Sequence, residues 1–390
     1  MTPKGFGGTG SGISAWPIVA RDTGERVSDV RVVRAEGDAL TRGRVIGCEL
    51  SDIIQRSIGF YHMYFERRGF SSQQLADMLA PYLDAAQAAV PELVDMMMGM
   101  AEAADVPLMD VFAVNAFEEL EPLVELPEGD PSPSGGGENT WSKPDRCSSL
   151  CLSGPGYTIV GHNEQWLAGD MGNVAVVIEL PGDGGTATAS PTYACCLPAT
   201  GVNSHAVALG IQSVTASDEG VGVPRVLVSR HALESAGRAD ALSRTALPGR
   251  SGGYGYCFAA RGGDTFRIET TTERQVVFDG PGVHTNHYLD PDLVRLSPEP
   301  SAGSRGRLER LTQLIDERTP DTPEAVMEIL SDHGAGSQPL CVHPDPDEGD
   351  EADAVVFSAM FELESGRMWV APGLPCQTGY EEVALTGVLD

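Results

Sequence analysis

The sequence lacks a hydrophobic run long enough to cross a membrane, and it lacks an export signal. Its apolar stretches stop well short of the roughly 18 to 20 residues that a membrane helix needs. The first residues, MTPKGFGGTGSGISAWP, carry neither a basic start followed by an apolar core nor a small-residue cleavage site. We therefore expect a cytoplasmic protein with no membrane partner.

Positive charge is also scarce. The 390 residues include 26 Lys and Arg against 56 Asp and Glu, which gives a formal net charge of -30 at pH 7. Nucleic acids bind proteins through clustered Lys and Arg that neutralise phosphate. This balance excludes nucleic acid as a partner, and we interpret the acidity as a contribution to solubility.

Motifs for cofactors and metals are missing as well. The sequence has no GxSxG elbow, phosphate-binding loop or dinucleotide fingerprint in a strand-to-helix setting, so no cofactor is expected. His284 and His287 stand three residues apart, but no third and fourth ligand follows at zinc spacing. His333, Cys341 and His343 lie in a loose context flanked by Gly and Pro. We therefore expect no metal site.

Cysteines are present but scattered, and a chain of this length can build a core without disulfides. The eight cysteines stand at positions 48, 147, 151, 195, 196, 257, 341 and 376. Reduced thiols are the simpler expectation.

The chain divides at a segment rich in Pro, Gly and Ser, residues 126–145, which sustains neither helical nor strand periodicity. Before it, residues 50–120 are predicted to be helical, with Ser71 and Gln74 spaced as a capping box. After it, glycine-punctuated β-like runs predominate, interrupted by helices. A helical first part and a strand-rich second part favour an α+β fold. The predicted strands are 157–161, 173–180, 206–214, 266–278 and 354–362, and the predicted helices are near 223–240, 305–317 and 323–333.

Cys147 stands where the 126–145 segment meets the first predicted strand, in the sequence DRCSSLC. By composition alone, a surface or core thiol is the ordinary interpretation. Other segments follow it in a fixed order: GHN at 161–163, GVNS at 201–204, GVPRVLVSRHALES at 222–235, VHTNH at 283–287 and PGLPC at 372–376. Together with PELVDMMMGMAEAA and the Asn115 to Glu119 segment upstream, they resemble the penicillin acyltransferase family of N-terminal-nucleophile hydrolases.

The resemblance implies a four-layer αββα sandwich with a helical pre-cleavage segment. It implies that the chain is cut between Arg146 and Cys147 into a helical chain, 1–146, and a catalytic chain, 147–390, which remain together as a heterodimer. The new N-terminal Cys147 would then supply a nucleophilic thiol, and its α-amino group, with a reference pKa of about 7.7 to 8.0, would be the general base. The expected substrate is a small N-acylated amine or peptide-like metabolite, cleaved through an acyl-Cys147 thioester.

The resemblance also assigns supporting roles. Asn286 matches the family's oxyanion donor, and the stretch from Asn163 to Gln165 is expected to supply a second, backbone donor. Gln165 stands where the family usually has Asp, and Val342 stands where it often has Arg. Arg230 is our candidate for the missing cation that would bind substrate.

Several functions stay open at this point. A self-processing amidohydrolase or acyltransferase leads, and hydrolysis is favoured because Gln165 and Val342 depart from the penicillin-making members. The alternatives are a catalytically impaired homologue that acts as a binding or scaffold protein, an acyl-CoA-dependent N-acyltransferase, and a thiol hydrolase with an internal Cys-His pair and no cleavage.

Overall fold

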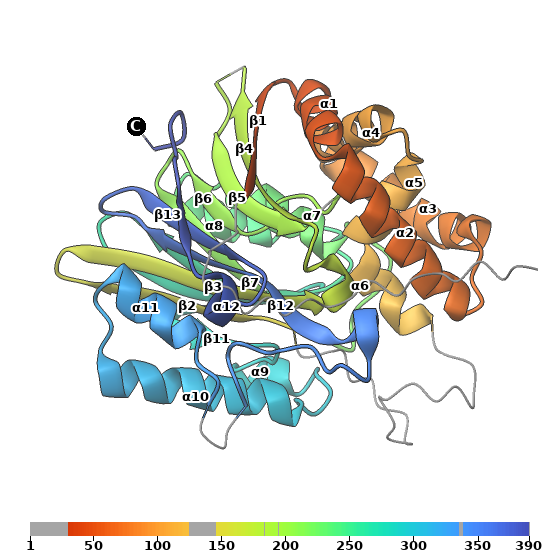
Figure 1. Cartoon of the computed structure of the whole chain (residues 1–390). Coiled ribbons are helices and arrows are strands. Elements are labelled where there is room, and N and C mark those ends of the chain that lie inside the picture. The colour runs from red at the N-terminus through yellow and green to blue at the C-terminus, as the bar shows by residue number, and fades with distance from the viewer. Residues whose placement is uncertain (1–29, 125–145, 183, 194, 335–337, 390) are drawn as a thin grey trace, which may run out of the picture.

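The computed structural model describes residues 30–124, 146–182, 184–193, 195–334 and 338–389. The Pro- and Gly-rich segment 126–145 lies outside these residues. Figure 1 shows two sheets packed face to face, helices on their outer faces and a helical bundle at one side. This confirms the predicted α+β, four-layer αββα arrangement. No helix within the described ranges is long and apolar enough to span a membrane.

The first sheet has eight strands in the order β1-β4-β5-β6-β7-β8-β9-β10. Its strand β1 comes from the part of the chain before Cys147 and pairs in parallel with β4, with Arg31 opposite Ala175. The two parts of the chain therefore share one sheet. The strands are β1 (Arg31–Gly37), β4 (Val174–Pro181), β5 (Thr188–Tyr193), β6 (Gly201–Asn203), β7 (Val207–Ser213), β8 (Tyr254–Ala260), β9 (Asp264–Thr270) and β10 (Gln275–Asp279).

The predicted strand 266–278 is two strands rather than one. The Thr271 N–H donates to the Arg274 carbonyl at 3.0 Å and closes a turn between β9 and β10. The periodicity of the run did not reveal this turn, because the polar residues that form it also fit the exposed positions of a half-buried strand.

The second sheet has six antiparallel strands in the order β11-β2-β3-β12-β13-β14. Its β2–β3 hairpin turns at Gly156, whose φ of 87° suits a residue without a Cβ. Residues on the inner faces of the two sheets build a shared core. The strands are β2 (Ser148–Gly154), β3 (Tyr157–Leu167), β11 (Gly282–His284), β12 (Asp353–Glu362), β13 (Arg367–Pro372) and β14 (Glu381–Val383).

Helices cover both outer faces. Two lie against the first sheet, α7 (Arg225–Leu233) and α8 (Arg238–Thr245), where one helix near 223–240 was expected. Two others lie against the second sheet, α10 (Ala302–Arg318) and α11 (Pro323–Leu330), in agreement with the predicted positions. Two short helices complete this part, α9 (Pro291–Val294) and α12 (Pro375–Thr378).

The predicted helical region before the 126–145 segment is confirmed as a bundle. Ser71 caps α3 by accepting from the Gln74 N–H, and the Gln74 side chain accepts from the Ser71 N–H, so the capping box is present. The bundle's helices are α1 (Ala39–Glu49), α2 (Ser51–Arg67), α3 (Ser72–Ala89), α4 (Pro91–Ala104), α5 (Leu108–Asn115) and α6 (Phe117–Leu120), followed by the 3₁₀ turn η1 (Glu121–Leu123).

Helices α1 and α4 cross so closely that their backbones are in contact. A Cβ on Gly43 would lie 2.1 Å from the Met96 carbonyl oxygen, and one on Gly99 would lie 2.2 Å from the Leu40 carbonyl oxygen. Only glycine fits at such a crossing. The neighbouring Met96 and Met97 are fully buried, which is the core-filling role expected for methionine.

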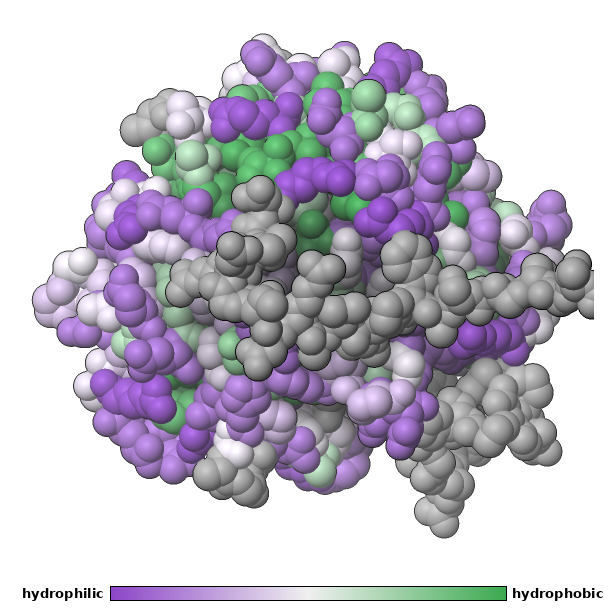
Figure 2. Space-filling view, viewed as in Figure 1, coloured by the Kyte–Doolittle hydropathy of each residue, from purple (hydrophilic) through white to green (hydrophobic). Residues whose placement is uncertain are grey.

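The surface is largely hydrophilic on the face that Figure 2 shows, as the net charge of -30 suggests. Hydrophobic residues gather in the upper part of this face, near β1 and β4 (Figure 2). Val32 of β1 is 45% exposed.

Candidate active site

Cys147 directly precedes β2, and it lines a cavity between the two sheets. Its backbone is held on both sides. The Cys147 N–H donates to Asn286 Oδ1 at 2.8 Å, and the Cys147 carbonyl accepts from Arg307 Nη1 at 2.5 Å. The peptide nitrogen that links Arg146 to Cys147 is therefore fixed in place.

Arg307 is the principal site residue that the sequence analysis missed. It lies on α10, 160 residues from Cys147, and it is buried. Besides the Cys147 carbonyl, it donates to Ser148 Oγ at 2.7 Å and to Asn286 Oδ1 at 2.9 Å. No local pattern distinguishes this arginine from its neighbours in SRGRLER, because its partners are brought to it only by the fold.

Asn286 follows β11, and its hydrogen bonds define which way the amide points. The Oδ1 atom accepts from Cys147 and Arg307, while Nδ2 donates to the Ser213 carbonyl at 3.0 Å. The Nδ2 group carries a second hydrogen besides the one that meets Ser213, so the oxyanion role of Asn286 stays a prediction. The Oδ1 atom of the same amide holds the Cys147 nitrogen.

Side chains alternate along β3 between two faces of the sheet. Glu164 and Trp166 line the cavity on the inner face. Asn163 points the other way, and its Nδ2 donates to the carbonyls of Leu330 and Leu340, each at 2.9 Å.

The Asn163 side chain belongs to the scaffold around the site, and the backbone donor expected from the Asn163 to Gln165 stretch stays a prediction at Gln165. Asn163 also accepts from Ser358 Oγ at 2.5 Å, so it is occupied in joining β3, β12 and the segment after α11. Gln165 shares the face of Asn163 and meets the site only through its backbone, which lies against the Cys147 thiol. A period of two residues places both side chains away from the cavity, whereas the intervening Glu164 reaches it.

His162 and Glu164 lie close to the Cys147 thiol. Each has a ligand-type atom within 4.8 Å of the sulfur. His162 Nε2 is 2.8 Å from Glu164 Oε2, and Nδ1 is 2.8 Å from Ser149 Oγ. Both ring nitrogens are therefore engaged, which argues against a simple Cys-His pair.

The Cys147 thiol is protonated at neutral pH in this state. Burial raises the pKa of the thiol well above its ordinary value, and the Glu164 carboxylate raises it further. The Gln165 backbone and the Arg307 cation act in the opposite direction but do not prevail. The sulfur thus needs a proton acceptor before it can attack a carbonyl.

Arg146 places its side chain in the same region. The guanidinium stacks on the Trp166 ring at 4.2 Å and forms ion pairs with Glu121 at 2.5 Å and Asp353 at 3.6 Å. Burial lowers the pKa of Arg146, but the carboxylates of Glu121, Asp353 and Glu118 outweigh this effect and raise it. Arg146 remains a cation although it is fully buried.

With Arg146 in place, the remaining cavity measures about 30 Å³. This space holds no more than a few water molecules. Its apolar wall is formed mainly by Trp166, Tyr193, Leu197, Ile211, Val226 and Phe357.

The Asn115 to Glu119 segment supports the cavity from the part of the chain before Cys147. Glu118 lines it and accepts a hydrogen bond from the Tyr254 hydroxyl. Asn115 fixes the wall beside it, since Oδ1 accepts from the Leu197 N–H and Nδ2 donates to the Cys195 carbonyl, each at 2.7 Å.

The structure corrects the expectation that Arg230 binds substrate. Arg230 is fully buried on α7, where it pairs with Glu179 at 3.0 Å and Glu234 at 2.9 Å. Its charge is thus neutralised away from the cavity, which it does not line. His284 and His287 also have other partners: His284 lies 2.8 Å from Glu269, and His287 lies 2.7 Å from Ser304.

Comparison with known proteins connects this site to a family. The family model described as acyl-coenzyme A:6-aminopenicillanic acid acyl-transferase matches residues 152–376. No curated protein sequence matches the chain. A variant of conjugated bile acid hydrolase from Clostridium perfringens is similar in structure, with 13% identity, a TM-score of 0.44 and coverage of 62% of this chain and 93% of that one. Penicillin V acylase from Agrobacterium tumefaciens shows 13% identity, a TM-score of 0.45 and coverage of 62% and 86%.

The structural likenesses are remote, so the sheets and helices described above establish the fold. The family match spans more than half of the chain and runs from β2 to α12. The chain is therefore an enzyme that belongs to the acyl-coenzyme A:6-aminopenicillanic acid acyl-transferase family.

Proposed function

We propose that this protein is the precursor of a cysteine amidohydrolase or acyltransferase that cleaves itself between Arg146 and Cys147. The observation that carries the proposal is the fixation of Cys147. Asn286 holds its peptide nitrogen and Arg307 holds its carbonyl, while the buried thiol lies among polar groups at the edge of a cavity. A structural cysteine would not need its backbone held by two side chains from distant elements.

The chemistry balances without a further reactant apart from water. The Cys147 sulfur attacks the Arg146 carbonyl carbon, the thiol proton passes to the Cys147 nitrogen, and the C–N bond breaks to leave a thioester. Water then attacks the thioester carbon. The Arg146 carboxylate leaves, the sulfur regains a proton, and Cys147 keeps a free α-amino group that stays within reach of Asn286 Oδ1.

In turnover, the α-amino group accepts the thiol proton while the sulfur attacks the substrate's acyl carbon. The amine leaves with a proton, and water hydrolyses the acyl-Cys147 thioester. An amine in place of water would give acyl transfer. We favour hydrolysis, because Gln165 and Val342 depart from the penicillin-making members of the family.

Arg146 indicates the class of acyl group. During self-cleavage its carbonyl occupies the position that a substrate's acyl carbonyl takes in turnover, so its side chain marks the acyl subsite. That subsite supplies the Trp166 ring and the carboxylates of Glu121 and Asp353. We infer a preference for acyl groups that end in a cation. A matched pair of substrates tests this: a 5-aminopentanoyl amide should exceed the hexanoyl amide of the same amine by about 10- to 100-fold in kcat/KM.

The decisive experiment for the proposed function combines intact mass measurement with acyl trapping. Purified wild-type protein should yield two chains that separate before Cys147 and should form a covalent adduct with an activated acyl substrate at that residue. Cys147→Ala should stay whole and form none, whereas Cys151→Ala should behave as wild type. A wild-type chain that stays whole and takes no adduct supports a binding protein. An adduct on a whole chain supports an uncleaved thiol hydrolase.

A further inference from the structure

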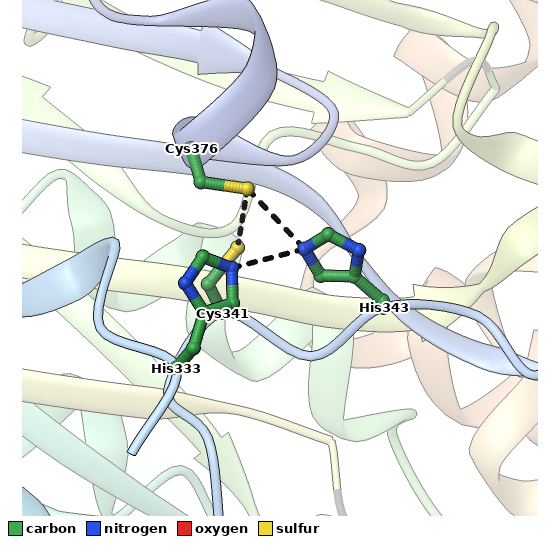
Figure 3. Close-up of side chains that lie close together, drawn as sticks. All are labelled: His333, Cys341, His343 and Cys376. Atoms are coloured by element: carbon green, nitrogen blue, oxygen red, sulfur yellow. Dashed lines mark hydrogen bonds between the residues drawn. The ribbon is translucent and has the colours of Figure 1, made fainter. Parts of the chain in front are cut away.

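Four potential metal ligands meet on the outer side of the second sheet, away from Cys147. His333 follows α11, Cys341 and His343 lie in the connection to β12, and Cys376 belongs to α12. Figure 3 shows that their side chains point toward one another. No short spacing motif links the four residues, because Cys376 stands 33 residues beyond His343.

The distances among the four ligand atoms are short. The two Nε2 atoms of His333 and His343 are 3.1 Å apart, and the sulfur atoms of Cys341 and Cys376 are 3.6 Å apart. His343 Nε2 lies 3.2 Å from the Cys376 sulfur, and all four atoms lie within 4.8 Å of one another. Four such atoms at this spacing form a candidate metal site.

We propose that His333, Cys341, His343 and Cys376 bind a structural zinc ion. Zinc bonds of about 2.3 Å to sulfur and about 2.0 Å to nitrogen in a tetrahedron imply ligand separations of about 3.8 Å for two sulfurs, 3.3 Å for two nitrogens and 3.5 Å for a mixed pair. The observed 3.6, 3.1 and 3.2 Å follow the same order and are each shorter by only a few tenths of an ångström.

The chemistry of the donor set also fits. Two thiolates and two neutral imidazoles bind Zn²⁺ with no net charge, and four protein ligands leave no position open for substrate, as in structural rather than catalytic sites. Asp332, the nearest carboxylate in sequence, does not compete as a ligand. It forms an ion pair with Arg310 at 2.7 Å and accepts from the Gly334 N–H.

One of the four ligands, Cys341, is held by packing and by a backbone hydrogen bond. Cys341 packs in a buried cluster with Val355 and Leu374, and its N–H donates to the Asp332 carbonyl at 3.0 Å. A metal here would tie the segment after α11 to α12 and close a long loop of the chain, which stabilises the folded state by restricting the unfolded one.

The site also connects with β3. Leu340, next to the ligand Cys341, offers its carbonyl to Asn163 Nδ2 at 2.9 Å. The zinc ion would hold in place one of the two carbonyls that position Asn163 on the outer face of the strand. It would therefore support the sheet from outside without touching the Cys147 site.

The test uses the full chain and Zn²⁺ itself. Protein expressed with zinc in the medium should contain one zinc per chain by elemental mass spectrometry. Replacement by Co²⁺ should give the visible bands of a tetrahedral ion with thiolate-to-cobalt charge transfer. His343→Ala and Cys376→Ser should each weaken zinc binding by at least about 100-fold, because even changes beyond the ligands cost about 10- to 100-fold. His205→Ala and Cys48→Ser, which change exposed residues elsewhere, should bind as wild type.

A second measurement does not depend on any variant. In wild-type protein, alkylation of exposed Cys376 should accelerate at least about tenfold when a chelator removes the metal, while exposed Cys48 should react at one rate throughout. Absence of bound zinc, tetrahedral cobalt bands that persist in the ligand variants, or a Cys341–Cys376 disulfide in the purified protein would overturn the proposal.

Discussion

The side chains on the two faces of β3 have different contacts. On the inner face, Glu164 and Trp166 line the cavity beside Cys147, and His162 lies close to the Cys147 thiol. The outer face presents Asn163, which joins β12 and the segment after α11 and continues toward the cysteine and histidine cluster. One strand thus separates the side chains near Cys147 from the side chains that join the surrounding elements. Substitutions on the inner face of β3 should change the rates of self-cleavage and turnover. Substitutions on its outer face should change the free energy of unfolding.

The largest effect is expected at the reacting sulfur. Cys147→Ala should abolish self-cleavage and reduce turnover on the order of 10⁴-fold or more, because no other group can form the thioester. Its melting temperature should stay near that of the wild type. Turnover and calorimetry of the variant, with Cys151→Ala as the control, measure both; residual turnover near the wild-type rate would assign the chemistry to another residue.

The second largest effect is expected at Arg307. This residue lies on the outer helix α10, but its side chain reaches the Cys147 site on the inner side of the sheet. Arg307→Ala should slow self-cleavage by about 10²- to 10³-fold, since it removes a charged donor from the Cys147 carbonyl and from Asn286. Arg307→Lys restores the charge without the planar fork and should recover part of the rate. Timed gels follow cleavage, and equal rates for Ala and Lys would show that the positive charge at this position is unimportant.

Substitutions on the outer face of β3 should lower the free energy of unfolding. Asn163→Ala leaves the Leu330 and Leu340 carbonyls without this donor and should cost about 2 to 3 kcal/mol of unfolding free energy. Self-cleavage should slow less than tenfold. Urea unfolding and cleavage rates of the same preparation give the two numbers. If stability is unchanged while cleavage stops, Asn163 acts on the chemistry directly and the comparison fails.

The smallest effect concerns pH. Burial lowers the pKa of His287 from 6.5 to about 4; the neighbouring His284, Arg307 and Arg305 lower it further, and Glu269 opposes this in part. Between pH 6.5 and 4, His287 is therefore protonated in the unfolded chain but neutral in the folded chain. The free energy of unfolding should fall as the pH drops from 6.5 toward 4. In His287→Asn this part of the pH dependence should flatten. Urea midpoints across the range measure it, and parallel curves for both proteins would exclude His287 as the cause.

Hydrophobic periodicity located the helical bundle and the longer strands β3, β4, β7 and β12, but it missed β1, β2 and most of the short strands. Ordered segments along the chain single out Cys147, and its role as nucleophile stays a prediction. The roles of individual side chains were harder to predict from the sequence. The stretch from Asn163 to Gln165 was expected to supply a backbone donor, and the Gln165 backbone lies against the Cys147 thiol. The sequence did not show that the Asn163 side chain points away from the cavity, because the strand's inner face was not known.

Contacts between distant segments could not be predicted at all. Arg307 is an ordinary helical arginine until the fold sets it beside Cys147. Arg230 seemed available for substrate because its partner Glu179 lies 51 residues away on another element. A single sequence reports the residue types, but it does not show which charges the fold has already neutralised.

One measurement tests the central claim most directly. An N-terminal cysteine carries its thiol and a free amine on adjacent carbons and condenses with 2-cyanobenzothiazole, whereas an internal cysteine forms no stable product. Wild-type protein should take one label per chain, located on Cys147 by peptide mapping, and Cys147→Ala should take none. A wild-type protein that remains unlabelled, with Arg146 and Cys147 recovered in one peptide, would contradict the account.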